Sequence, residues 1–232
     1  HNPGEWNGTK LTRENAIPIS GATGIQNIER IVNENAYAPE SDAPGSISTY
    51  DVIPEYVAFV QSKAALARPV KIGIDMANGM GILEAEALKG VVQFDAIFDE
   101  LDGSFPNHEA NPLKESTLVD LQSMMREGNY DFGVAYDGDA DRAGFVDEKG
   151  NIVPMDIMTA LIAKDILHSE KGTILYDLRS SSAVKEVIEE SGGKPVMSRV
   201  GHAFIKQQMR EEGAIFAGEL SGHYYFRDNF FN

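Results

Sequence analysis

The stretch that decides the fold reads Phe132-Gly133-Val134-Ala135-Tyr136-Asp137-Gly138-Asp139-Ala140-Asp141-Arg142. Five residues typical of a buried strand lead directly into three aspartates at alternate positions. Alternate side chains of an extended chain point the same way, so Asp137, Asp139 and Asp141 are expected to converge. Converging carboxylates raise one another's pKa unless a cation neutralises them, and Mg²⁺ prefers such oxygen ligands. Arg142 adds a fork of donors that suits phosphate oxygens. The stretch therefore predicts metal-assisted phosphate chemistry.

Strands and helices alternate on both sides of this stretch. The expected strands are 70–75, 94–98, 132–136, 173–176, 195–197 and 214–217, and the expected helices are 26–35, 55–67, 82–89, 113–127, 155–167, 182–191 and 203–212. Such alternation predicts an α/β fold built from parallel βαβ units. A hairpin turn is expected at 148–151, between apolar pairs at 145–146 and 152–153.

The alternation restarts after that turn, which divides the chain. We expect two α/β blocks in tandem, residues 48–149 and 150–232, with residues 1–47 as the end of a preceding domain and its linker. The second block is expected to lack its last helix. The chain opens without methionine and closes on Phe230-Phe231-Asn232, so we expect a piece of a longer protein.

Composition narrows the class of protein. The chain has 232 residues, of which 42% are hydrophobic, enough for one or two domains with real cores. Its net charge of −16 argues against nucleic acid as a partner, because a phosphate backbone needs basic surface. No run approaches the ~18 apolar residues of a membrane span, and no leader resembles a signal peptide. The absence of cysteine excludes thiolate chemistry and favours a cytoplasmic protein. The sequence makes no prediction of oligomeric state.

The ends of the other strands carry polar loops. Ligands of open parallel sheets bind beyond the carboxyl ends of the strands, which places these loops on one rim with the aspartates. The loops are Asp177-Leu178-Arg179-Ser180, Ser198-Arg199-Val200-Gly201-His202 and Gly218-Glu219-Leu220-Ser221-Gly222-His223. The last one offers a carboxylate that suits paired sugar hydroxyls. Gly201 precedes a helix whose free N–H groups could bind an anion.

Each signal also has a plainer interpretation. With Glu148, the aspartate triplet matches positions 1, 3, 5 and 12 of an EF-hand calcium loop, but Arg142 occupies the position that requires glycine. A solvated acidic turn is a further alternative. The two loop arginines could be surface ion-pair partners, and His202 could cap a helix. Gly79-Met80-Gly81 lacks the third glycine of a dinucleotide fingerprint, so close helix–strand packing is the preferred interpretation.

Taken together, these segments resemble the α-D-phosphohexomutases of the phosphomannomutase/phosphoglucomutase branch, over nearly all of the chain. Residues 1–10, which begin His1-Asn2-Pro3, resemble the second half of that family's Ser-His-Asn-Pro active-site loop. Residues 137–142 resemble its metal loop, and 218–223 resemble its sugar-recognition loop; 103–108 and 199–202 also fit. The resemblance implies phosphoglucomutase-type domains in tandem, each of three α/β/α layers with a mixed, mostly parallel sheet.

The same resemblance implies an activity. A hexose phosphate, of mannose or glucose, would exchange its phosphate between positions 1 and 6 through a phosphoserine enzyme and a hexose 1,6-bisphosphate, which also serves as activator. It implies Mg²⁺ on Asp137, Asp139 and Asp141. The catalytic residues that it implies are His1, Lys10 and Arg142, and the substrate-binding residues are Arg179, Arg199, Gly201, His202, Glu219, Ser221 and His223.

The sequence departs from the family pattern in three respects, which keep alternatives open. The nucleophilic serine would immediately precede His1, the family's fourth domain would follow Asn232, and Arg179 stands where some relatives have lysine. A phosphoglucosamine mutase is the near alternative, although Leu220 occupies a position where that branch usually has glutamine. A non-catalytic sugar-phosphate or metal-binding fragment is the alternative from another class.

Overall fold

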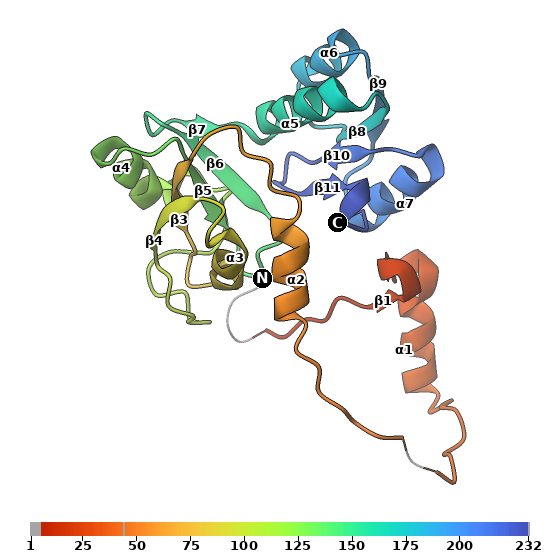
Figure 1. Ribbon diagram of the computed structural model, residues 1–232. Helices are drawn as coiled ribbons and strands as arrows, with labels where there is room; N and C mark the ends of the chain where they lie inside the picture. The colour runs from red at the N-terminus through yellow and green to blue at the C-terminus, as the bar shows by residue number, and fades with distance from the viewer. Residues whose placement is uncertain (1–5, 44, 232) are drawn as a thin grey trace.

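The computed structural model describes residues 6–43 and 45–231. In the N-terminal segment, red to orange in Figure 1, the helix at 26–33 and the linker after it lie away from the two sheet domains. This segment contains the paired strands β1 (Thr12–Arg13) and β2 (Ile17–Pro18), a π-helical turn (Gly21–Ile25) and α1 (Gln26–Asn33). No residue of these elements is buried.

The first sheet has the strand order β4-β3-β5-β6-β7. Its strands are β3 (Lys71–Asp75), β4 (Gln93–Ile97), β5 (Phe132–Tyr136), β6 (Ala143–Asp147) and β7 (Ile152–Val153). The first three are parallel, whereas β6 and β7 return antiparallel through the expected hairpin. Three helices accompany the sheet: α2 (Ile53–Gln61), α3 (Gly81–Leu88) and α4 (Val119–Glu127).

Alternation along β3 explains the layers of this domain. Ile72 and Ile74 form one core cluster with apolar residues of α3. A Cβ at Gly73, between them, would meet Leu121 and Met125 of α4 on the opposite face. Successive side chains of a strand point to opposite faces, so the sheet is covered by helices on both sides. The domain therefore has three layers, as expected from the family resemblance.

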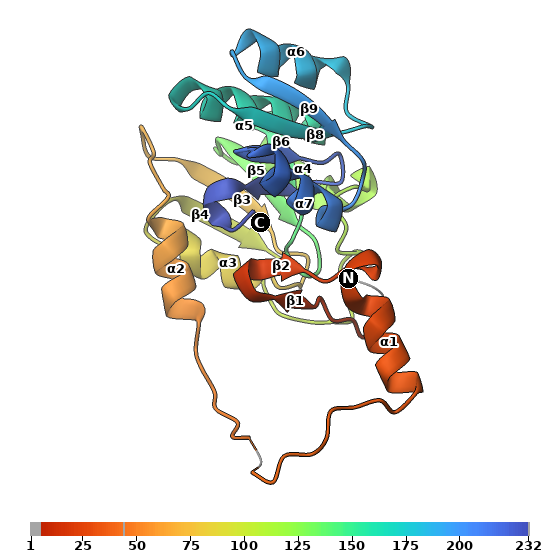
Figure 2. The same ribbon diagram turned by 90° about the vertical axis from the view of Figure 1, so that its right-hand side faces the viewer.

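The second sheet repeats this plan with the order β11-β10-β8-β9. Its strands are β8 (Thr173–Asp177), β9 (Lys194–Ser198), β10 (Phe216–Gly218) and β11 (Tyr224–Phe226), of which only β11 is antiparallel. Its helices are α5 (Met155–Ser169), α6 (Ser182–Glu190) and α7 (His202–Glu212). Ile174 packs with α5 and α6, whereas Leu175 packs with α7, so this sheet is also covered on both faces. Figure 2 shows the helices lying on both sides of this sheet.

Several element predictions were wrong in detail. The helix expected at 55–67 ends at Gln61, because residues 62–69 are all exposed and gain no packing that would offset their ordering. The helix expected at 113–127 begins at Val119, since Thr117 donates its hydroxyl to the carbonyls of Asn111 and Lys114. Strand β11 was not expected at all.

Two further observations concern the limits of the domains. β7 belongs to the first sheet although it follows residue 150, so the hairpin crosses the boundary that the sequence predicts. Among the described residues, no helix combines the length and apolar character needed to cross a membrane.

Candidate active site

The acidic triplet lies in the turn that joins β5 to β6. Asp137 directly follows β5 and is fully buried, whereas Asp139 and Asp141 are about one-third exposed (37% and 36%). One oxygen from each carboxylate lies within 4.8 Å of the others. The three side chains do converge, and a set of three carboxylate oxygens suits a hard divalent cation.

Two cationic side chains balance the triplet. Arg142 donates from Nε to Asp137 Oδ2 at 2.7 Å, and its backbone N–H donates to Asp137 Oδ1 at 3.1 Å. Lys10 Nζ donates to Asp139 Oδ2 at 2.7 Å and also donates to Asp141. The two exposed carboxylates thus share one ammonium group, which shows how strongly this turn attracts positive charge.

The pKa values follow from this arrangement. Burial, with repulsion from Asp141, raises the pKa of Asp137 to about 6. Burial alone would also raise the pKa of Asp141, but hydrogen bonds from His223 and Lys10 hold it well below its ordinary value. Burial opposes the charge of Lys10, yet its bonds to Asp139 and Asp141 raise the pKa of Lys10 overall. Asp137 therefore holds its proton more tightly than an ordinary aspartate does. A cation bound at the triplet would favour its ionised form.

The EF-hand alternative is wrong. Glu148 would have to close the calcium loop, but β6 separates it from the triplet and pairs with β5 along its whole length. Five extended residues span roughly 16 Å at about 3.3 Å each, so Glu148 lies at the opposite end of the strand. Glu148 approaches Lys149 instead, at 3.7 Å.

The loop after β10 presents a second set of polar groups. Glu219 is buried; its Oε1 accepts from the backbone N–H of Gly201 at 3.1 Å, and its Oε2 accepts from the hydroxyl of Tyr225 at 2.5 Å. Ser221 Oγ lies 2.8 Å from His223 Nδ1. The Glu219 N–H donates to the His223 carbonyl at 2.9 Å, which closes the turn into β11. The loop is thus a compact turn whose polar side chains are already oriented.

These two loops, from different sheets, touch each other. The N–H of Ala143 donates to the carbonyl of Gly222 at 3.1 Å, and His223 Nε2 lies 3.4 Å from Asp141 Oδ1. Gly222 has a φ of +83°, and a Cβ there would lie 3.2 Å from the Ala143 carbonyl. Only glycine accommodates both the left-handed conformation and the close approach. The acidic turn and the loop at 218–223 therefore form one site.

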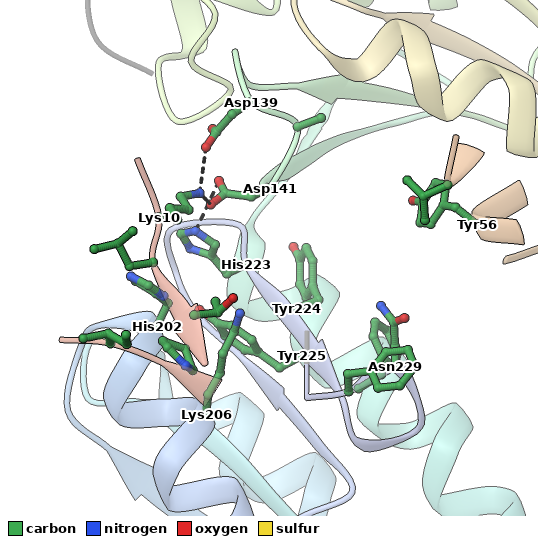
Figure 3. Close-up of a pocket in the computed structure, with 18 of the residues that line it drawn as sticks. Lys10, Tyr56, Asp139, Asp141, His202, Lys206, His223, Tyr224, Tyr225 and Asn229 are labelled. Carbon is green, nitrogen blue, oxygen red and sulfur yellow. Dashed lines mark hydrogen bonds and ion pairs between the residues drawn. The ribbon is translucent and has the colours of Figure 1, made fainter. Parts of the chain in front are cut away.

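A cavity of about 960 Å³ lies beside this junction. Figure 3 shows Lys10, Asp139, Asp141, His202, Lys206 and His223 gathered at one end, with Tyr56 and Asn229 at the other. Burial, with repulsion from Lys206, lowers the pKa of His202. Burial, with repulsion from Lys10, lowers the pKa of Lys206. One end of the cavity thus brings cationic groups against the acidic turn, an arrangement suited to an anionic ligand.

Arg199 and Arg179 lie outside the cavity lining. The guanidinium of Arg199 stacks on the Phe204 ring, 3.1 Å from its centroid. Arg179 donates from Nη2 to the buried carboxylate of Asp177 at 2.7 Å. His1 lies outside the described residues.

Sequence reasoning missed three residues of the site. Asp177, to which sequence reasoning assigned no role within its loop, is the fully buried last residue of β8, as Asp75 is of β3. Lys206 lies one helical turn after His202 on α7, a spacing visible in the sequence. Tyr225 lies in the unexpected strand β11, so its bond to Glu219 had no signal in the sequence.

The segment Gly79-Met80-Gly81 packs against the acidic turn and the end of β5. The N–H of Met80 donates to the carbonyl of Gly138 at 3.1 Å. A Cβ at Gly79 would lie 2.9 Å from that same carbonyl oxygen, and one at Gly81 would lie 2.7 Å from the ring of Tyr136. The preferred interpretation of these glycines as residues of close packing is confirmed.

Two three-layer α/β domains meet at this site, one contributing three convergent carboxylates and the other a loop with a carboxylate, a hydroxyl and an imidazole. Residues 54–150 match phosphoglucomutase/phosphomannomutase α/β/α domain II, and residues 154–231 match α/β/α domain III of the same family. The chain belongs to the phosphoglucomutase/phosphomannomutase family.

Individual relatives agree with this assignment. The chain is 40% identical to a phosphomannomutase of Escherichia coli and 36% identical to a phosphoglucomutase of Neisseria meningitidis, over 98% and 100% of its own length. It covers 53% and 50% of those proteins, so it spans about half the length of the curated relatives. A crystal structure of a family protein from Burkholderia thailandensis superposes with a TM-score of 0.83 at 33% identity, covering 88% of this chain and 44% of the other.

Proposed function

We propose that the protein containing this chain is a phosphohexomutase, which interconverts the 1-phosphate and the 6-phosphate of mannose or glucose through a phosphoserine enzyme and a hexose 1,6-bisphosphate. The observation that carries the proposal is the junction of the two loops, with His223 Nε2 3.4 Å from Asp141 Oδ1. A mutase must hold the sugar and the transferring phosphoryl group at one place, and this junction joins the groups suited to each. The relatives named phosphomannomutase and phosphoglucomutase support the choice of hexose.

The proposed metal is Mg²⁺, held by Asp137, Asp139 and Asp141. The donor set fits, because three carboxylate oxygens lie within 4.8 Å of one another and two of the side chains are accessible. When bound, the ion would supply charge neutralisation for the transferring phosphoryl group. Arg142, fixed by its bonds to Asp137, adds a permanent positive charge beside it.

Glu219 and Ser221 would bind the sugar. An ionised carboxylate offers about four acceptor positions, and Glu219 uses one oxygen for Gly201 and the other for Tyr225, so acceptor capacity for sugar hydroxyls is left. His223 orients the hydroxyl of Ser221 at 2.8 Å. Because these groups hold hydroxyls and not the phosphate, the same loop can bind the sugar in both orientations that a 1,6 exchange requires.

Lys10 would handle the proton. In the first half-reaction the serine–phosphate bond breaks as a sugar oxygen forms its bond to phosphorus, and the sugar hydroxyl releases a proton while the serine oxygen takes one up. In the second half-reaction the other sugar–phosphate bond breaks as the serine oxygen bonds to phosphorus, and the proton moves from the serine hydroxyl to the sugar oxygen. Lys10 is held as an ammonium by Asp139 and Asp141, a form that can return a proton to the serine oxygen. When Asp139 and Asp141 no longer bond to Lys10, burial lowers the pKa of Lys10, and its neutral amine can accept the proton of the sugar hydroxyl. The proposed serine adjoins His1, and Arg179, Arg199, Gly201 and His202 would contact the phosphorylated sugar.

The test uses the full-length protein. Glucose 1-phosphate, mannose 1-phosphate and glucosamine 1-phosphate are supplied separately with Mg²⁺ and a priming amount of glucose 1,6-bisphosphate, and the 6-phosphate product is measured by a coupled assay. Intact mass before and after priming reports phosphate uptake at the proposed serine. Absence of turnover together with absence of phosphate uptake would overturn the proposal. Turnover confined to glucosamine phosphate would favour the phosphoglucosamine mutase alternative.

A further inference from the structure

The fully buried carboxylate of Asp177 has no role in the activity proposed above. Its Oδ1 accepts from the backbone N–H of Arg179 at 2.7 Å and from Arg179 Nε at 3.3 Å. Its Oδ2 accepts from Arg179 Nη2 and from the backbone N–H of Leu220, each at 2.7 Å. Burying a carboxylate is costly unless hydrogen bonds compensate, and here both oxygens are occupied.

The partners of Asp177 come from two separate loops of the site. Leu220 lies between Glu219 and Ser221, the residues proposed to bind sugar hydroxyls. Arg179 is proposed to contact the phosphorylated sugar, and it reaches the site from the end of β8. A single carboxylate therefore fixes the position of one loop relative to the other.

The bond to Leu220 differs from the other bonds of its loop. Glu219 and Gly222 bond within the turn, through the Glu219 N–H to the His223 carbonyl and the Gly222 N–H to the Glu219 carbonyl. Those two bonds set the shape of the turn, while the bonds from Ala143 to Gly222 and from Gly201 to Glu219 attach it to the acidic turn and to the start of α7. The Asp177–Leu220 bond attaches the turn to the end of β8. Its loss would leave a turn of the same shape, still attached to the acidic turn and to α7, that can shift relative to Arg179.

The first sheet contains a matched aspartate. Asp75 ends β3, is also fully buried, and accepts from the backbone N–H two residues ahead, that of Ala77, at 2.8 Å. Its other oxygen pairs with His108 Nε2 at 3.0 Å. The two carboxylates share burial, position in the strand and local bonding, but Asp75 holds a loop that contains no proposed sugar contact.

We propose that Asp177 is a positioning residue that holds Arg179 and the sugar-binding loop at 218–223 in register, so that one hexose phosphate can contact both. This proposal extends the proposed function and depends on it for the identity of the ligand. It assigns to Asp177 an effect on sugar-phosphate affinity and none on metal affinity, because its bonds reach neither the acidic turn nor Lys10.

The test is Asp177→Asn in the full-length protein. Both oxygens of Asp177 accept hydrogen bonds, so an amide in either orientation sets its NH₂ against an N–H donor of Leu220 or Arg179. The expected result is a rise in KM for the hexose phosphate of about tenfold, a smaller change in kcat and an unchanged Mg²⁺ requirement. Asp75→Asn is the control: His108 can change tautomer and accept from the new amide, so KM should stay within about twofold. Equal rises in KM for both variants, or no rise for Asp177→Asn, would overturn the proposal.

A second measurement needs neither substrate nor a folded variant. In the unaltered protein the Leu220 amide should exchange its hydrogen as slowly as amides of β8, because Asp177 accepts from it in a buried position. Rapid exchange at Leu220 would refute the attachment even if the variant fails to fold. The two proposals can fail separately. If the unaltered protein shows no mutase turnover, the proposed function fails. Slow exchange at Leu220 in that same protein would still support the attachment of the loop to Asp177.

Discussion

Gly79 offers a direct way to move the acidic turn without altering any of its charges. A Cβ at Gly79 would lie 2.9 Å from the Gly138 carbonyl oxygen, whereas ordinary contacts begin at 3.4 Å. The backbone of the acidic turn would have to retreat by about half an ångström, since that oxygen has no rotamer to change. Misplacement by 1 Å can cost about a hundredfold in rate, so half of that predicts a loss of about tenfold in kcat/KM for Gly79→Ala.

The assay measures mutase rate against Mg²⁺ concentration, with thermal unfolding alongside. Gly79→Ala should raise the half-saturating Mg²⁺ concentration and destabilise the fold by about 1–3 kcal/mol. Gly73→Ala is the matched control in the same sheet, because the atoms nearest its Cβ would all belong to side chains: the flexible sulfur atoms of Met124 and Met125, at 3.2 Å, and a methyl carbon of Leu121, at 3.5 Å. It should lower stability while leaving the Mg²⁺ requirement unchanged. An unchanged Mg²⁺ requirement in Gly79→Ala, or an equal change in both variants, would refute the reasoning.

Three further outcomes are expected. Asp139→Asn removes one proposed ligand charge from an exposed part of the turn, so turnover should be lost. The circular dichroism spectrum and the melting temperature should stay close to those of the unaltered protein. Retained Mg²⁺-dependent turnover would contradict the metal assignment. The hydrogen bond to Asp75 raises the pKa of His108 above its ordinary value, so the pair stabilises the fold most below about pH 6.5, and this contribution is lost as the pH rises through the raised pKa. His108→Gln should therefore cost about 1–2 kcal/mol at pH 5.5 and clearly less at pH 9 in urea unfolding, and a pH-independent cost would count against it. Tyr225→Phe removes a hydroxyl donor from buried Glu219 and should raise KM for the hexose phosphate several-fold, with the Mg²⁺ requirement as the unaffected control.

Much of the fold was predictable because it depends on local patterns. Alternating strands and helices predicted two α/β blocks, and the rule that ligands bind beyond strand ends brought the loops at 137–142 and 218–223 to one rim. The glycines at 79 and 81 were interpreted as packing residues, and each now proves to lack room for a Cβ. Errors arose where a local pattern was outweighed by its surroundings. Alanine-rich residues 62–67 favour a helix by propensity, but all of them are exposed and bury no apolar face, so α2 ends at Gln61.

The sequence by itself determined which residues we propose to carry the chemistry: three aspartates at alternate positions, an arginine beside them, and a glutamate, serine and histidine in a loop with two glycines. Only the tertiary structure decided how these groups are held. The contact of Gly222 with Ala143, the attachment of Leu220 to Asp177 and the bond of Tyr225 to Glu219 join residues from different elements. The physical reason is that periodicity and motif spacing report the direction of side chains along one element. Which N–H meets which carboxylate across two elements depends on the packing of both sheets.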